Sequence, residues 1–180
     1  MNWDRIARRV RVPLGFLLAA IYGWLARPTL GSILVGLVVS ATGLGIRAYA
    51  SGYVRKNETL ATTGPYAYTR NPLYLGSIII AAGFALAARS WMIGAILLLM
   101  FLAIYLPVIR GEEKFLREHF PEFSEYERRV PRLFPRLFGI ASSGGSFSWA
   151  LYHQHREYNA LAGTLAMTAA LAAKLLWFSR

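Results

Sequence analysis

The sequence predicts an all-α integral membrane protein with about five transmembrane helices. Hydrophobic residues make up 56% of its 180 residues, more than an ordinary soluble domain carries. They are gathered in long apolar runs, and Lys and Arg are gathered between the runs. By its length the chain is a single membrane domain, residues 1–180. Its expected parts are two N-terminal helices (1–50), a core with a helical hairpin (51–136), a linker (137–148) and a C-terminal helix (149–180).

The first part predicts two helices behind a basic amphipathic segment. The first apolar run extends from Val12 to Ala26, after the four arginines of residues 1–11. A signal peptide has the same layout, but no small-x-small cleavage site follows the run, which favours a retained helix. The second helix, Thr29 to Ala50, is long enough to cross about 30 Å of hydrocarbon. A small residue recurs at every fourth position, which permits close helix packing, at Ser32, Gly36 and Ser40.

The core is expected to contain a tight helical hairpin across the membrane. Its arms are the apolar runs Leu73–Ala88 and Trp91–Ile109, and Arg89 and Ser90 separate them. Pro107 lies near the end of the second arm and is predicted to kink or end that helix, because proline lacks the backbone donor of a helix interior.

The chain then becomes abruptly polar over residues 110–136. Phe115, Leu116 and His119 share one helical face, which predicts a short amphipathic helix on the membrane surface. A Gly- and Ser-rich stretch follows and indicates a flexible linker. The last apolar run, Tyr158 to Phe178, predicts the fifth transmembrane helix.

The distribution of Lys and Arg predicts the orientation. They number four before the first helix, one at Arg27, four from Arg47 to Arg70, one at Arg89, eight from residue 110 to residue 156, and two at the C-terminal end. This alternation is the positive-inside pattern of a five-helix protein with a cytoplasmic N-terminus. The net charge of +11 is thereby explained by topology and by membrane lipids, and nucleic acid is not an expected partner. The chain has no Cys, which excludes disulfides and thiolate chemistry.

Residues 58–76 form the stretch on which the functional prediction depends. Gly64-Pro65 and Asn71-Pro72 are turn signals a few residues apart, so the backbone is expected to bend twice. Three tyrosines and Arg70 lie in this bend, a mixture that suits a ligand that is part apolar and part charged. A juxtamembrane loop with aromatic side chains at the headgroup level is the alternative.

Several motifs in order resemble the isoprenylcysteine carboxyl methyltransferase family, and more broadly the membrane methyltransferases that include phospholipid N-methyltransferases. The motifs are Gly64-Pro65-Tyr66, Arg70-Asn71-Pro72-Leu73-Tyr74-Leu75-Gly76, Glu112-Glu113 and Tyr126-Glu127-Arg128-Arg129-Val130-Pro131. The resemblance implies that residues 51–136 are a methyltransferase core with a cytoplasmic cofactor-binding loop. The expected cofactor is S-adenosylmethionine, and the expected acceptor is a lipophilic molecule that enters from the bilayer. No GxGxxG motif follows a strand, so a Rossmann-type enzyme is not indicated.

The resemblance also implies the site residues. The positions that correspond to the family's cofactor contacts are Glu58, Thr59, Leu60, Ala61, Tyr66, Asn71, Pro72, Leu73, Tyr74, Leu75 and Glu112. Glu112 is preferred over Glu113 because of its spacing to Leu116. Arg110 is only an approximate counterpart of the family's substrate arginine, and Asn71 stands where the family often has histidine. Asn can form hydrogen bonds but does not carry a proton near neutral pH.

The acceptor group stays open, with a preference for a carboxylate. A carboxylate needs only a cation, and Arg70, Arg110 and Arg117 are candidates. An amine, as in a phospholipid headgroup, needs a base within reach, for which Glu113 and His119 are candidates. A non-enzymatic membrane scaffold is the alternative from another class, and in it the two glutamates are only solvated charges on a surface helix.

No metal site is expected. His153 and His155 are two residues apart, so they point to different faces of a helix, and no cluster of carboxylates accompanies them.

Overall fold

A computed structural model describes residues 3–55, 58–139 and 145–178. The elements in chain order are α1 (Trp3–Leu25), α2 (Leu30–Ser51), the 3₁₀ turn η1 (Gly64–Ala67), α3 (Pro72–Ala88), α4 (Trp91–Met100), the π-helical segment η2 (Phe101–Tyr105), α5 (Leu106–His119), α6 (Phe123–Arg129), α7 (Trp149–Gln154) and α8 (Tyr158–Phe178). The described residues contain helices and no strands, which confirms the all-α prediction.

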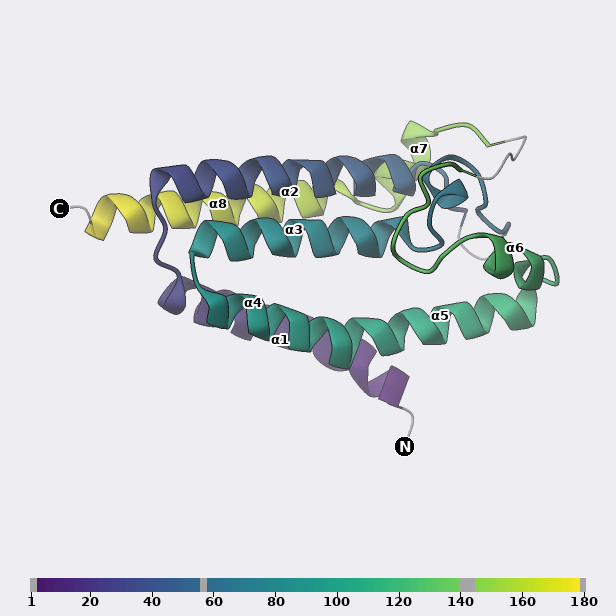
Figure 1. The fold of residues 1–180 in the computed structure, drawn as a ribbon, viewed down its shortest axis with the longest axis horizontal. Coiled ribbons are helices and arrows are strands. Elements are labelled where there is room, and N and C mark those ends of the chain that lie inside the picture. Colours follow the sequence, from purple (N-terminus) through teal and green to yellow (C-terminus); the bar gives the residue numbers. More distant parts are fainter. Residues whose placement is uncertain (1–2, 56–57, 140–144, 179–180) are drawn as a thin grey trace.

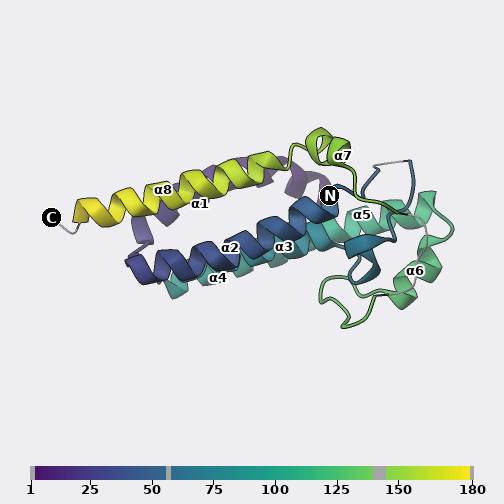
Figure 2. The same cartoon turned by 90° about the horizontal axis from the view of Figure 1, so that it is seen from above.

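The long helices form a bundle of two layers that run roughly parallel to one axis. α2, α3 and α4 form one layer, and α8 and α1 lie behind it (Figures 1 and 2). α5 extends past the ends of α2 and α3, and α6 and the loop that carries η1 lie beside this extension. We call this end of the bundle, which holds α5, α6 and η1, the polar end.

Three described helices are long and apolar enough to cross a membrane. They are Leu30–Ser51, the continuous helix Trp91–His119, and Tyr158–Trp177. Two shorter apolar helices, Pro13–Leu25 and Pro72–Ala88, lie in the same bundle. The membrane prediction is therefore confirmed, while the number of five spans stays a prediction.

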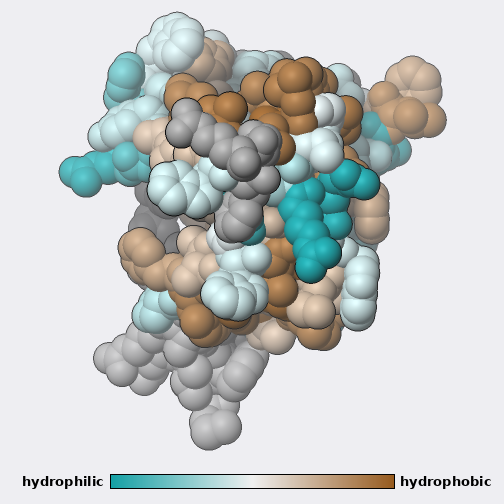
Figure 3. Space-filling view, turned by 90° about the vertical axis from the view of Figure 1, so that its left-hand side faces the viewer, coloured by the Kyte–Doolittle hydropathy of each residue, from teal (hydrophilic) through white to brown (hydrophobic). Residues whose placement is uncertain are grey.

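Exposed aromatic residues mark both ends of the apolar part of the bundle. Trp24, Trp91 and Trp177 are exposed at the end opposite the polar end. Tyr49 and Trp149 are exposed at the polar ends of α2 and α7. Figure 3 looks onto the first of these ends, where apolar and weakly polar surface predominates and strongly hydrophilic residues lie in separate places, right of the centre and at the left edge. Aromatic belts at both ends are typical of the two interfaces of a membrane-spanning bundle.

The helix from Trp91 to His119 corrects two predictions. Pro107 neither kinks the chain sharply nor ends the helix. The π-helical segment η2 precedes it and accommodates the missing backbone donor of the proline. Leu106 at the end of this segment donates its N–H to Phe101 O. The amphipathic helix is therefore present as α5, but it is a continuation of the transmembrane arm and projects from it.

The predicted linker, residues 137–148, lies partly outside the described residues, which omit 140–144. Its described end packs on the bundle, where the Phe147 ring is stacked at 6.2 Å on the Tyr49 ring. Ser148 then caps α7, a short helix that the sequence analysis did not predict.

α2 and α3 pack more extensively than any other pair of helices, as the small-residue seam predicted. A Cβ added to Gly83 would lie 2.6 Å from Gly36 O, and one added to Gly43 would lie 2.5 Å from Gly76 O. Ser40 also donates its hydroxyl to Ile80 O at 3.4 Å. In lipid there is no hydrophobic driving force between apolar helices. The close approach of the two backbones therefore stabilises the pair through van der Waals contact.

Replacing Gly43 with Ala should therefore destabilise the bundle by about 1–3 kcal/mol, the usual cost of overpacking. Gly45 is the matched control on the same helix, because a Cβ there meets nothing within 4 Å. Gly45→Ala should leave stability unchanged or raise it. Thermal unfolding in detergent measures both, and equal midpoints for the two variants would contradict the packing argument.

Candidate functional site

A cavity of about 530 Å³ lies at the polar end. Its walls come from the loop before α3, the first turn of α3, the exposed part of α5, and α6. This volume is within the range of small-molecule and cofactor sites. One wall is aromatic and aliphatic and another carries charged side chains, so the cavity suits a ligand of mixed character.

Most residues that the resemblance implicates line this cavity. The lining contains Thr59, Leu60, Ala61, Tyr66, Asn71, Leu73, Tyr74, Glu112 and Glu113. Glu58, Pro72, Leu75 and Arg110 do not line it. Glu58 and Arg110 are exposed, and Pro72 is buried as the first residue of α3.

Adjacent glutamates on α5 have different environments. Glu112 is exposed at the cavity, where its Oε1 accepts a hydrogen bond from the Tyr74 hydroxyl at 3.0 Å. The Tyr74 ring is in turn packed edge-on against Tyr105 at 6.1 Å. The Glu113 side chain is only 3% exposed. Glu112 is therefore the carboxylate that a ligand in the cavity reaches more easily.

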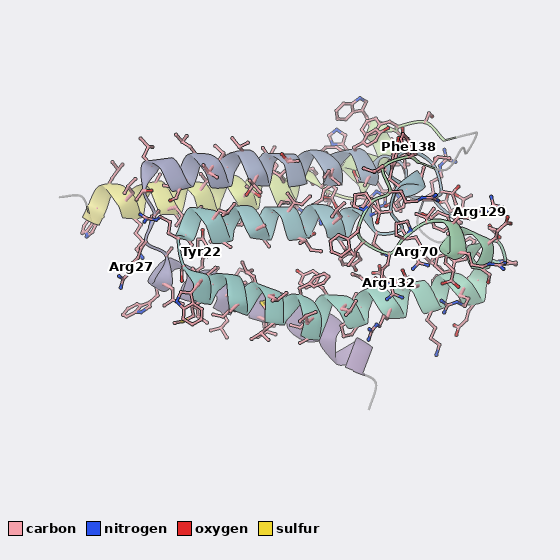
Figure 4. All side chains as sticks on the ribbon, viewed as in Figure 1. Tyr22, Arg27, Arg70, Arg129, Arg132 and Phe138 are labelled. Atoms are coloured by element: carbon pink, nitrogen blue, oxygen red, sulfur yellow. The ribbon has the colours of Figure 1, made fainter. Side chains whose placement is uncertain are left out.

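Glu113 is held by three donors from two other segments. Arg132 pairs with its Oε2 at 2.7 Å, and Arg70 pairs with its Oε1 at 3.3 Å. The Asn71 amide donates to Oε1 at 3.2 Å and also to Arg132 O at 3.1 Å. Burial of a carboxylate is costly unless it is paired and hydrogen-bonded. Glu113 therefore joins α5 to the loop before α3 and to the segment after α6. Figure 4 labels its two arginine partners, Arg70 and Arg132, at the polar end.

A second carboxylate extends this network onto α6. Glu127 accepts hydrogen bonds from Arg117 at 3.0 and 2.7 Å and from Arg70 at 3.2 Å. The hydrogen bonds from Arg117 are the main cause that lowers the pKa of Glu127. The ring of Phe123 lies 5.9 Å from both guanidinium groups, which adds cation–π attraction.

Two tyrosines close the deep side of the cavity. The Tyr126 hydroxyl donates to Tyr66 O at 2.7 Å, and both side chains are buried. Burial raises the pKa of both hydroxyls, so each stays a neutral hydrogen-bond donor across the physiological range. They do not provide a base.

Comparison with known proteins adds the family. Residues 12–122 match the family described as phospholipid methyltransferase, which is more than half of the chain. The chain belongs to the phospholipid methyltransferase family. The match extends from α1 to the start of α6 and so includes most residues of the cavity wall. This match confirms the prediction that the chain belongs to the broader group of membrane methyltransferases. The closer relationship to isoprenylcysteine carboxyl methyltransferases stays a prediction.

Two curated proteins are similar in sequence to this chain. The cobalt-zinc-cadmium resistance protein CzcN of Cupriavidus metallidurans is 39% identical over 71% of this chain and 62% of its own length. The nickel-cobalt-cadmium resistance protein NccN of Alcaligenes xylosoxydans xylosoxydans is 39% identical over 63% of this chain and 53% of its own length. The chain thus spans a little over half the length of these relatives. No solved structure matches it.

The sequence analysis missed Arg132 and Glu127 as parts of this family member's site. Both lie in or beside the motif Tyr126–Pro131, which carried part of the resemblance but from which no site residue was predicted. An available signal in the sequence was the apolar pair Tyr126 and Val130, four residues apart on one helical face, which predicts that the segment packs on the protein; both are buried in the structure.

Arg47 is a third residue whose role was not predicted. It pairs with Glu157 through two hydrogen bonds, at 3.0 and 2.8 Å, and also donates to Ser77 at 2.6 Å and to Leu73 O at 3.3 Å. These contacts join α2 and α3 to the start of α8. A charged residue in an apolar helix requires a partner of opposite charge. The position of Arg47 in such a helix could therefore have predicted an ion pair.

The histidines lie away from the cavity chemistry. His119 is exposed, does not line the cavity, and its Nδ1 lies 2.9 Å from Phe115 O. Among residues 3–55, 58–139 and 145–178, no group of three metal-ligating side chains is found.

Glu113→Gln should destabilise the folded protein by up to about 3–5 kcal/mol, because it removes a carboxylate partner from the largely buried Arg70 and from the partly exposed Arg132. Glu118 is a matched control on the same helix. It is exposed and pairs with Lys114 at 3.9 Å, so Glu118→Gln should cost less than about 1 kcal/mol. Chemical denaturation in detergent compares them. A small cost for both variants would show that the network does not hold the site together.

The lowered pKa of Glu127 predicts a dependence of stability on pH. Its contribution is fully present above the unfolded pKa of about 4.3 and is lost as the pH falls through the lower folded pKa. Glu127→Gln should therefore be less stable than wild type near neutral pH, by about 1 kcal/mol or less because Arg117 is exposed. The difference should shrink below about pH 4. Melting temperatures across this range test it, and a constant difference would refute the assignment.

Proposed function

We propose that this family member transfers a methyl group from S-adenosylmethionine to a lipophilic acceptor in the membrane. The observation that carries the proposal is the cavity at the polar end, lined by both aromatic and charged residues and formed largely within the family match. A water-soluble donor and a membrane-borne acceptor need a site that is open to water and adjacent to apolar helices, and this cavity satisfies both needs.

The lining fits the groups that the cofactor presents. Tyr66 and Tyr74 offer aromatic faces, which attract a cationic sulfonium. Glu112 offers a carboxylate for an ammonium or ribose hydroxyl, oriented by the Tyr74 hydroxyl. Backbone groups of residues 59–61 lie in the same wall and can bind an adenine edge.

When bound, the cofactor supplies an activated methyl group, and transfer is a direct displacement in which the bond from sulfur to methyl breaks as the bond to the acceptor forms. The chain's residues hold and orient the two reactants, which is where such an enzyme gains most of its rate. The described lining contains aromatic and charged groups and needs no nucleophile for this reaction.

A carboxylate is the acceptor group that the charges favour. Together with Arg55 and Glu112, which also line the cavity, four arginines (Arg55, Arg70, Arg117 and Arg132) meet three carboxylates (Glu112, Glu113 and Glu127), which leaves one positive charge in excess. Arg70 lines the cavity, and its buried Nε has no hydrogen-bond partner among the described residues. We therefore assign to Arg70 the role of substrate cation that the resemblance gave to Arg110. The reaction that we propose is therefore carboxyl methylation, like that of the isoprenylcysteine methyltransferases.

An amine acceptor is the second candidate, since the family name refers to phospholipids. An amine must lose a proton before it attacks, and Glu113 is engaged with two arginines and an amide. Glu112 is then the carboxylate left to take the proton. A scaffold without activity is the third candidate and predicts no cofactor binding.

We also propose that the N-terminus and the cavity face the cytoplasm. The polar end carries most of the basic residues, whereas Arg27 and Arg89 lie at the opposite end, where Lys174 caps the last carbonyls of α1. This distribution follows the positive-inside rule.

Titration of the purified protein with S-adenosylmethionine tests the site. Glu112→Gln and Tyr74→Phe should each weaken binding by about 1–3 kcal/mol, the value of a hydrogen bond to a charged group. Glu118→Gln changes the same charge on the same helix outside the cavity and should bind like wild type. Equal affinities for all four proteins would remove the proposed site, and no binding by any of them would favour the scaffold.

The pH dependence of methyl transfer into a lipid extract identifies the acceptor. A carboxylate is ionised above about pH 4, so its methylation should be nearly constant from about pH 6 to 8 and give base-labile esters. An amine with a pKa near about 10 should react faster as the pH rises, by up to about tenfold per unit, and give base-stable label. The second result would refute the carboxylate assignment and leave methyl transfer intact.

A further inference from the structure

The segment from Arg132 to Phe138, which we call the interfacial loop, presents apolar side chains that the protein does not cover. Phe134, Leu137 and Phe138 are 86%, 91% and 83% exposed. They follow two arginines in the repeated pattern Arg-Leu-Phe-Pro-Arg-Leu-Phe. A short segment with three large apolar side chains in solvent calls for a partner.

The backbone of this loop is fixed to the protein at one level of the bundle. Arg70 N donates to Pro131 O at 2.9 Å, and the Thr69 hydroxyl donates to Arg132 O at 3.1 Å. Arg136 N donates to Tyr68 O at 3.0 Å. The loop therefore lies beside the residues that directly precede α3, the point where the chain enters the apolar bundle (Figures 1 and 4). Its exposed side chains are therefore held at the level where α3 begins.

The charges beside the loop favour an anionic surface. Arg128 and Arg136 are exposed, and among the described residues each donates to a backbone carbonyl, Ser124 O and Arg129 O respectively. Their positive charges are therefore not neutralised by a carboxylate of the described chain. Basic residues near a membrane surface are attracted to anionic lipid phosphates.

We propose that the interfacial loop inserts into the headgroup–acyl boundary of an anionic lipid leaflet. Phe134, Leu137 and Phe138 enter the boundary, while Arg128 and Arg136 bind lipid phosphates. Arg132 belongs to the same loop and pairs with Glu113 in the cavity wall. Insertion thereby ties the wall of the cavity to the membrane surface.

A second copy of this chain is a less suitable occupant. Three side chains on one loop form a small patch compared with the roughly 800 Å² per partner of a stable interface. Two such patches would also bring the basic groups of both copies together. Lipid satisfies both the apolar and the charged groups at once.

Single-cysteine labelling tests the proposal. Because the chain has no native Cys, only the introduced residue is labelled. Phe138→Cys carries a nitroxide label, and the full-length protein is reconstituted in phosphatidylcholine vesicles with or without phosphatidylglycerol. Ser124→Cys, exposed on α6 at the same end, is the control. We expect the label at 138 to be accessible to oxygen in the bilayer and protected from an aqueous relaxing agent, and the label at 124 to show the opposite.

The anionic lipid should increase the buried fraction of the label at 138, and Arg128→Gln with Arg136→Gln should reverse this increase. The ratio of buried to exposed label should fall by about fivefold per arginine removed. An aqueous label at 138 in both vesicles would overturn the proposal. A label that is buried in lipid-free detergent and shows spin–spin broadening would overturn it in favour of a second copy of the chain.

Discussion

The cavity depends on one buried carboxylate. At 3% exposure, Glu113 requires positive partners, and Arg70 and Arg132 come to it from segments before α3 and after α6. Removal of one partner from a buried ion pair costs about 3–5 kcal/mol, against about 1 kcal/mol for an ordinary hydrogen bond. The network is therefore the strongest single constraint at the polar end. It fixes α5 relative to the loop before α3, and these two elements form most of the cavity.

The bundle beneath the cavity is held in a different way. In lipid the apolar surfaces of helices gain little by meeting, so backbone contact through small residues and a few polar interactions must hold them. α2 and α3 use the first means, at Gly43 and Gly76. α8 uses the second, through the pair of Glu157 with Arg47. Arg47 also donates to the backbone oxygen of Leu73, which lines the cavity, so this ion pair supports the cavity wall.

The sequence predicts the apolar helices and most of the cavity lining, because hydrophobic runs and the family motifs are local patterns. The continuity of α4 and α5 was not predicted, since a proline in an apolar run ordinarily kinks or ends a helix and no sequence pattern indicated the π-helical segment η2 before Pro107. The division of roles between Glu112 and Glu113 also required the structure. Neighbouring residues on a helix point in different directions. Arg132, whose ion pair with Glu113 distinguishes the two glutamates, comes from a different segment of the chain.

The most direct test of the central claim is photo-crosslinking of radiolabelled S-adenosylmethionine to the protein in membranes, followed by peptide mapping. The claim is that this cofactor binds in the cavity between the loop before α3 and α5. It predicts that label is found in residues 58–75 and 111–126 and that unlabelled S-adenosylhomocysteine displaces it. Competed label elsewhere, for example in the groove between α1 and α8 that Tyr22 and Leu171 line, would contradict it.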